Sequence, residues 1–151
     1  MKQLLEKIRE LNVLIIGDLV LDHYIWGDAS RISPEAPVPV IEVDHDSYAA
    51  GGAANVALNV NALGATTELC GILGNDDSGK QLRRILMECN VPIDEAFILS
   101  NKQTVLKTRV MVRKQQICRL DRESKPEDYK IDIEKQKDLI IEKVKTADAV
   151  I

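Results

Sequence analysis

The stretch Ala50-Gly51-Gly52-Ala53-Ala54-Asn55-Val56-Ala57 decides the fold class of this chain. Two adjacent glycines allow backbone torsions and close contacts that a Cβ atom would forbid. Small residues and an apolar helical run follow, and the run closes at Gly64. A glycine turn that leads into a helix collects free backbone N–H groups and the positive end of the helix dipole at one place. The stretch therefore predicts a site for an anionic or hydroxyl-rich ligand at the start of a helix over residues 53–63.

Two asparagines lie on one face of this predicted helix. Asn55 falls in the first turn, and Asn59 lies one turn further along. Asparagine is a poor helix former, so its presence twice needs a reason. One interpretation is that both side chains face water beside a tight turn. The other is a substrate cradle formed with Gly51 and Gly52, in which the Asn55 amide donates and accepts hydrogen bonds to sugar hydroxyls.

An acidic loop precedes this stretch. Residues 13–16 form a continuous apolar run that ends in Gly17-Asp18, the pattern of a central parallel strand with ligand-facing residues at its carboxyl end. Asp18 and Asp22 flank the end of this strand. A single aspartate in such a loop is usually a cap or turn former. Two of them at this edge of a parallel sheet are candidate acceptors for sugar hydroxyls.

The remaining elements predict an α/β sheet with a small β lid. Prolines at 34, 37 and 39 exclude a central strand there and favour an edge or an extended excursion. Residues 66–73 predict a second core strand, and Ser78 with Gln81 predicts a capping box for a helix to about Cys89. Residues 148–151 are typical of the start of a buried strand, and because such a strand needs neighbours, we expect the chain to be the N-terminal part of a longer protein.

Residues 105–120 differ from the rest, because apolar and charged side chains alternate around a predicted turn at residues 114–116. This pattern indicates an antiparallel hairpin with two different faces. Residues 102–125 carry eight lysines and arginines against two acidic residues. The positive charge either keeps a solvated strand from pairing with other chains or recognises a phosphate on the substrate. Arg109 and Arg119 are the preferred candidates for phosphate recognition.

One stretch, Gly74 to Gln81, nearly fits the P-loop pattern of nucleotide-binding proteins. Gln81 stands where a hydroxyl should hold magnesium, and Asp76 and Asp77 would place two negative charges inside a phosphate cradle. We therefore interpret this stretch as an ordinary helix N-terminus, whose dipole favours acidic residues.

The composition excludes several classes of partner. A hydrophobic content of 45% and a charged content of 29% are typical of one soluble globular domain. Aromatic residues make up 3% and the net charge is −4, which argues against nucleic acid and acidic membranes as partners. The three cysteines form no Cys-x-x-Cys motif. They predict reduced thiols in a cytoplasmic protein, and no metal site is expected.

The pattern small-Gly-x-Ala-x-Asn-x-Ala from Ala50, followed after six residues by Gly64 and after nine more by Gly74, resembles the N-terminal signature of the ribokinase (PfkB) family of sugar kinases. Other segments are similar to the heptose-7-phosphate kinases within that family; they are Gly17–Asp22, Ser30–Val40, Arg109, Gln115-Gln116 and Arg119–Asp121. The resemblance covers roughly residues 10–123. In this family an aspartate a few residues past the first strand contacts the sugar, and Asp22 occupies the corresponding place.

The resemblance implies a ribokinase-like three-layer α/β fold, of which residues 1–151 would be the N-terminal, sugar-binding part, with lid segments at about 23–48 and 103–121. The implied reaction is ATP- and Mg²⁺-dependent phosphorylation of the anomeric hydroxyl of D-glycero-D-manno-heptose 7-phosphate, for the ADP-heptose of the lipopolysaccharide core. The resemblance also implies a homodimer formed through the lid. The family's Gly-Ala-Gly-Asp motif with its catalytic aspartate is absent from residues 1–151, so we expect the C-terminal ATP-binding and catalytic part to be missing and no catalytic residue to lie here.

Two alternatives remain open from the sequence. The chain could be another ribokinase-type sugar kinase, or a non-catalytic module that binds a sugar phosphate or forms a dimer.

Overall fold

The computed structural model describes residues 2–130 and 132–151, and its core is a parallel sheet. Strand β1 (Asn12–Ile16) lies between β4 (Thr66–Cys70) and β9 (Ala149–Val150), and both pairings are parallel. Val13, Leu14 and Ile15 are buried, because this strand is covered on both faces. The prediction of a central parallel strand over residues 13–16 is confirmed.

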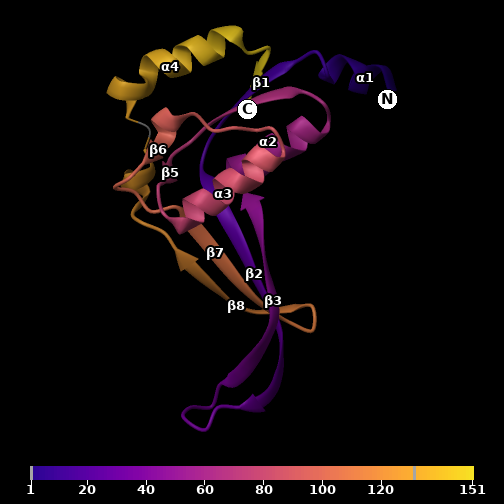
Figure 1. Cartoon of the computed structure of the whole chain (residues 1–151), viewed down its shortest axis with the longest axis vertical. Coiled ribbons are helices and arrows are strands. Elements are labelled where there is room, and N and C mark those ends of the chain that lie inside the picture. The colour runs from indigo at the N-terminus through magenta and orange to yellow at the C-terminus, as the bar shows by residue number, and fades with distance from the viewer. Residues whose placement is uncertain (1, 131) are drawn as a thin grey trace.

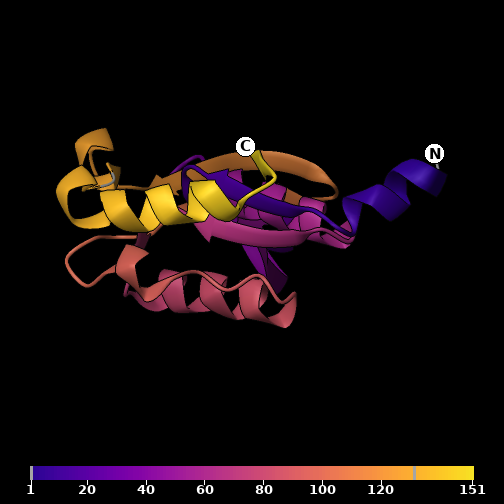
Figure 2. The same ribbon diagram turned by 90° about the horizontal axis from the view of Figure 1, so that it is seen from above.

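Helices cover both sides of this sheet, which gives three layers. Figure 2 shows α3 (Asp77–Glu88) on one side and α4 (Ile133–Thr146) on the other. Helix α2 (Gly52–Ala62) begins at the double glycine as predicted, and it lies beside α3, where Asn61 Nδ2 donates a hydrogen bond to Cys89 O over 2.7 Å. None of the described helices is long and apolar enough to span a membrane.

A second sheet, here called the lid sheet, leaves the core at one end (Figure 1). It consists of β2 (Leu19–Ile32), β3 (Pro39–Gly51), β7 (Val105–Val112) and β8 (Gln115–Arg122) in the order β3-β2-β7-β8. Strands β2 and β7 pair in parallel, and the two outer pairings are antiparallel. The expected hairpin over residues 105–120 is confirmed. The proline segment forms the loop of a long β2–β3 ribbon, and β3 is an edge strand of the sheet.

The remaining elements are short. They are α1 (Lys2–Ile8), β5 (Leu73–Gly74), β6 (Ile98–Leu99) and the 3₁₀ helices Glu95–Phe97 and Pro126–Tyr129. The predicted single strand over residues 66–73 is wrong, since β4 ends at Cys70 and β5 pairs with β6 in a separate sheet. The physical reason lies at Gly71, where a Cβ atom would stand 2.3 Å from the carbonyl oxygen of Gly17. The two backbones approach closely at this point, and β4 ends one residue before it.

Two local predictions also need correction. The turn of the hairpin is formed by Arg113 and Lys114, both with positive φ (48° and 71°), one residue before the predicted position. A two-residue turn with both residues in this region matches the twist of the strands it joins. Helix α3 begins at Asp77 and is capped by Asp76, not by Ser78, because the Asp76 side chain accepts a hydrogen bond from Gly79 N.

Candidate sugar site

The double glycine fixes the start of α2 against the loop between β1 and β2. Gly52 has a φ of +57°, and a Cβ atom there would lie 2.3 Å from the carbonyl oxygen of Asp18. Ala53 N donates a hydrogen bond to that same oxygen over 2.9 Å. A Cβ at Gly51 would lie 2.7 Å from Asp22 Oδ2. Both glycines are therefore required by close approach, as the sequence predicted, and they lie directly beside the two candidate aspartates.

Asp22 belongs to strand β2, so its predicted place in a loop after the first strand is wrong. Its Oδ1 accepts a hydrogen bond from Arg109 Nη1, and the two side chains form an ion pair. The guanidinium carbon of Arg109 also lies 5.4 Å from the centre of the Tyr24 ring, within reach of a cation–π interaction. The hydrogen bond with Asp22 raises the pKa of Arg109 and outweighs the opposite effect of burial. Arg109 is thus a fixed positive charge with an oriented guanidinium.

Six side chains gather on one face of the lid sheet, here called the charged face. In the register of the sheet, Asp22 lies opposite Lys107, and Arg109 lies opposite both Tyr24 and Arg119. Directly opposed residues share a face because side chains alternate along each strand. The charged face comprises Asp22, Tyr24, Lys107, Arg109, Arg119 and Asp121.

A second carboxylate balances the remaining cations of the charged face. Arg119 Nε lies 2.8 Å from Asp121 Oδ1, and Lys107 Nζ lies 3.7 Å from Asp121 Oδ2. Three cations therefore share two carboxylates. The face keeps an excess positive charge, which suits an anionic group of a ligand.

A cavity of about 220 Å³ lies where the charged face meets the core. Its polar lining comes from Asp18, Lys107, Glu123, Ser124 and Tyr129. Asp18 is exposed and lines the cavity, and its backbone carbonyl accepts the hydrogen bond from Ala53 at the start of α2. Lys107 belongs to both the cavity and the charged face. Lys107 was not predicted as a site residue, although it shares the alternation of Arg109 and could have been found by that signal.

Asn55 is the candidate that stands apart. It is exposed in the first turn of α2, and its Oδ1 accepts a hydrogen bond from Asn59 Nδ2 over 3.3 Å. The structure thus brings Asp22, Arg109 and Arg119 together and places Gly51 beside them. Asn55 follows Gly51 by one helical turn without contacting a residue of the charged face in the described part of the chain.

The near-P-loop stretch does not form a free phosphate-binding loop. In the near-P-loop stretch, Gly79 N donates to Asp76 Oδ1, so this backbone group is not free for a phosphate. Over residues 2–130 and 132–151, no group of three or more His, Cys, Asp and Glu side chains is placed to hold a metal ion. No step of phosphoryl transfer is therefore assigned to these residues.

Related proteins have sequences similar to this one over most of its length. "Bifunctional protein HldE" from Helicobacter pylori (strain G27) is 46% identical over 142 residues, which cover 92% of this chain and 30% of the relative. The protein of the same name from Sulfurimonas denitrificans is 41% identical over 139 residues, with 92% and 29% covered. The chain thus spans about 30% of the length of the curated relatives it matches.

Solved structures share the fold at lower identity. A microbiome-derived acarbose kinase is 21% identical with a TM-score of 0.64, and the match covers 87% of this chain and 43% of the kinase. A ribokinase from Arabidopsis thaliana is 21% identical with a TM-score of 0.58, and the match covers 74% and 36%. These matches confirm the ribokinase-like α/β fold. The family model described as pfkB family carbohydrate kinase matches residues 11–146. The chain therefore belongs to the pfkB family of carbohydrate kinases.

Proposed function

We propose that this chain is the sugar-binding part of a kinase that phosphorylates the anomeric hydroxyl of D-glycero-D-manno-heptose 7-phosphate, using ATP and Mg²⁺, to supply ADP-heptose for the lipopolysaccharide core. The observation that carries the proposal is the charged face, where Asp22 pairs with Arg109 and lies opposite Lys107, which also lines the neighbouring cavity. A sugar that already bears a phosphate needs both kinds of group. The relatives named HldE support the same assignment.

In this proposal the carboxylate of Asp22 binds the sugar hydroxyls, and the cations of the charged face bind the phosphate. Asp22 accepts hydrogen bonds from sugar hydroxyls, and Arg109 holds its carboxylate in one orientation. A guanidinium has five N–H donors, so Arg109 keeps donors for the substrate after bonding Asp22. Arg109, Arg119 and Lys107 bind the phosphate of the substrate, for which forked guanidinium donors are well suited. Gly51 and Gly52 let the start of α2 approach the sugar, and Asn55 is proposed to turn toward it when the ligand binds.

Phosphoryl transfer also needs bound nucleotide, magnesium and an activated hydroxyl. We assign neither nucleotide binding, magnesium binding nor activation of the hydroxyl to residues 1–151. We expect residues 1–151 alone to bind the sugar phosphate without turning it over.

Calorimetric titration tests the proposal. The chain should bind heptose 7-phosphate more tightly than unphosphorylated heptose. Arg119→Gln should weaken binding of the phosphorylated sugar about tenfold or more, since a hydrogen bond to a charged group contributes about 1.5–3 kcal/mol. The same variant should leave the unphosphorylated sugar unaffected. Arg31→Gln, an exposed arginine on β2 outside the charged face, is the matched control and should change neither affinity.

Two results would contradict the proposal. Equal affinity for both sugars would remove the phosphate-binding role, and no affinity for either would remove the sugar site. Sugar-phosphate binding without kinase activity in the intact gene product would favour the alternative of a non-catalytic binding module.

We also propose a homodimer formed through the lid sheet. Several large apolar side chains are exposed on this sheet and its loop, namely Ile32, Val38, Val43, Tyr48, Ile117 and Leu120. Contiguous exposed apolar surface marks protein interaction sites, and these side chains are the candidates for such a surface on the lid sheet. Sedimentation analysis should show a dimer for the native chain and a monomer for Leu120→Lys; a monomeric native chain would contradict this.

A further inference from the structure

The near-P-loop stretch has no part in the proposed phosphate site, yet it makes a dense set of contacts. The carboxylate of Asp76 accepts three hydrogen bonds. Oδ1 accepts from Gly79 N over 2.8 Å and from Thr104 Oγ1 over 2.7 Å, and Oδ2 accepts from Thr104 N over 3.0 Å. One side chain therefore joins the start of α3 to a residue 28 positions further along the chain.

Thr104 completes the junction from the other side. It is 1% exposed, and its hydroxyl accepts a hydrogen bond from Gly74 N over 3.1 Å while it donates to Asp76. The backbones are too close for larger residues. A Cβ at Gly74 would lie 2.5 Å from Lys102 O, and a Cβ at Gly79 would lie 2.0 Å from Gly74 O. Both carboxylate oxygens of Asp76 and the Thr104 hydroxyl have partners, and the two glycines make the contact possible.

The clamp stays charged at neutral pH. Burial alone would raise the pKa of Asp76, but the hydrogen bonds from Thr104 and Gly79 outweigh it and the pKa is lowered. An ionised carboxylate makes stronger hydrogen bonds than a neutral one. The junction is thus a firm attachment rather than a helix cap alone.

The position of the clamp in the fold indicates what it controls. Thr104 directly precedes β7, which carries Lys107 and Arg109. These two residues lie opposite Asp22 and Tyr24 of β2. The hydrogen bonds that hold Thr104 to Asp76 therefore also determine the position of Lys107 and Arg109 relative to Asp22.

We propose that Asp76 and Thr104 are positioning residues, which anchor the start of β7 to the α/β core and thereby set the affinity of the charged face for a phosphorylated sugar. The choice of ligand rests on the proposed function, whereas the anchoring of β7 does not. Neither residue touches the substrate. The clamp acts through Lys107 and Arg109.

Four single substitutions test the anchoring without any ligand. Thr104→Val removes the hydroxyl at nearly constant shape, and Thr104→Ser restores it. Asp76→Asn weakens the carboxylate side of the clamp, and Asp77→Asn is the matched control because Asp77 lies next to it in the first turn of α3 with its side chain fully exposed.

Trp26 supplies the readout, since it is the only tryptophan and lies on β2 opposite Met111 of β7. Acrylamide quenching of its fluorescence should increase in Thr104→Val and Asp76→Asn, at unchanged far-UV circular dichroism. Thr104→Ser and Asp77→Asn should match the native chain. Unchanged quenching in both clamp variants would overturn the proposal. Loss of the far-UV signal would do so too, because the pair would then hold the whole fold rather than the lid sheet.

Steady-state kinetics of the intact gene product test the consequence. Thr104→Val should raise the KM for heptose 7-phosphate about tenfold, the scale of one lost hydrogen bond to a charged group, and leave the KM for ATP unchanged. Thr104→Ser should recover the native value. An equal rise in both KM values, or none in either, would overturn the positioning role. If the native protein does not phosphorylate heptose 7-phosphate at all, the proposed function fails, while the Trp26 measurement still decides the anchoring.

Discussion

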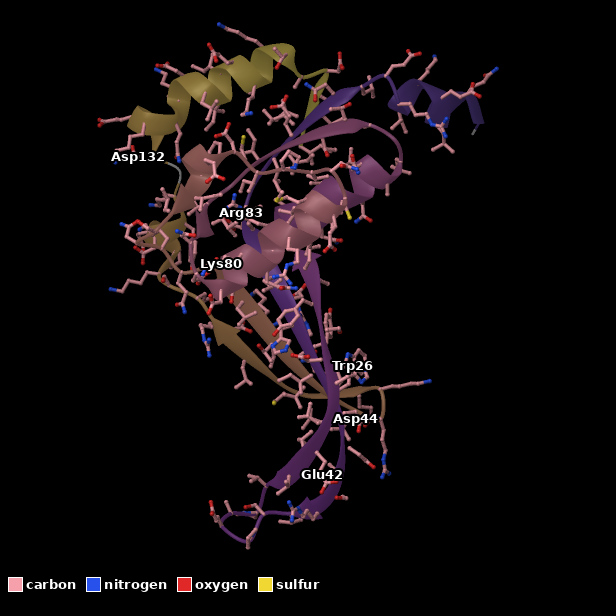
Figure 3. The ribbon with its side chains drawn as sticks, in the orientation of Figure 1. Trp26, Glu42, Asp44, Lys80, Arg83 and Asp132 are labelled. Atoms are coloured by element: carbon pink, nitrogen blue, oxygen red, sulfur yellow. The ribbon has the colours of Figure 1, made fainter. Side chains whose placement is uncertain are left out.

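The α/β core and the lid sheet are stabilised in different ways. In the core, β1 and β4 bury their side chains in a continuous apolar cluster. In the lid sheet, β8 is exposed along its whole length, and burial along β2 fades after Leu21. Figure 3 shows Trp26, Glu42 and Asp44 on the ribbon far from the helices, whereas Lys80 and Arg83 lie on α3. The lid sheet is therefore attached to the core over a short region near Leu21, Ala50 and Thr104.

The lid sheet combines a few buried valines on β7 with several ion pairs. Asp22 pairs with Arg109, Arg119 with Asp121, and Arg113 with Asp28. The Arg113–Asp28 pair is exposed, and pairs of that kind contribute only about 0–1 kcal/mol each, whereas the Asp22–Arg109 pair is partly buried. The outer part of the lid sheet therefore buries less apolar surface than its root at Leu21 and Ala50, which belong to the core cluster. The candidate ligand site lies where the lid sheet meets the core.

The largest expected effect comes from breaking the root. Leu21 is fully buried and belongs to the core cluster, although its strand continues into the lid sheet. Leu21→Ala should lower the free energy of unfolding by about 2–5 kcal/mol, since it removes buried methyl groups and leaves a cavity. Ile32→Ala, at the far end of the same strand with 64% exposure, should change it by less than about 0.5 kcal/mol. Urea unfolding measures both.

Similar costs for the two substitutions would show that the difference between core and lid sheet is not real. The m value, which is the dependence of the unfolding free energy on urea concentration, shows whether either variant alters the surface exposed on unfolding.

A smaller effect is expected from an ion pair of the core. Lys143 Nζ on α4 lies 2.8 Å from Glu68 Oε2 on β4. The hydrogen bond from Lys143 lowers the pKa of Glu68 below its usual 4.5. The contribution of the Glu68–Lys143 pair to stability is therefore complete above about pH 4.5, and it is lost as the pH falls through the lower pKa that Glu68 has in the folded state. Glu68→Gln should cost roughly 1 kcal/mol at neutral pH, given its partial exposure, and should flatten the loss of stability in acid.

Asp28→Asn is the counterpart in the lid sheet, because Arg113 lowers the pKa of Asp28 in the same way but both side chains are exposed. Its effect on the acid dependence, measured by thermal unfolding between about pH 3 and pH 7, should be the smaller of the two. A larger effect at Asp28 would contradict the ranking of core over lid sheet.

The smallest effect concerns chemistry rather than stability. Cys70 is buried in β4, and burial raises its pKa to about 11. Cys118 on β8 and Cys89 are exposed. Since the thiolate is the reactive form, iodoacetamide should label Cys89 and Cys118 in the native chain and Cys70 only after unfolding. Mass spectrometry of the labelled peptides checks this, and rapid native labelling of Cys70 would show that the core opens.

Parts of this molecule follow from sequence pattern and others do not. The apolar run before Gly17 and the alternation over residues 105–120 predicted their strands, because each pattern is local. The long strand β2 was not predicted, because it is defined by its pairing with β3 and with β7, and β7 lies far away in the sequence. The break at Gly71 was also missed, because its cause is the distant backbone of Gly17.

The candidate site shows the same division. Asp22 and Arg109 were each selected by their own surroundings in the sequence. Their pairing depends on the parallel alignment of β2 with β7, which joins residues 87 positions apart. The P-loop interpretation was rejected on chemistry, but the bond from Thr104 to Asp76 needed the folded chain.

The sequence by itself determined the glycine turn, the helix after it, the apolar strand β1 and the family, because backbone freedom and hydrophobic period act within a few residues. Only the tertiary structure decided which acids meet which bases and where the lid sheet is anchored. The reason is physical: an ion pair or a clamp exists only when strand register brings distant side chains within hydrogen-bond distance.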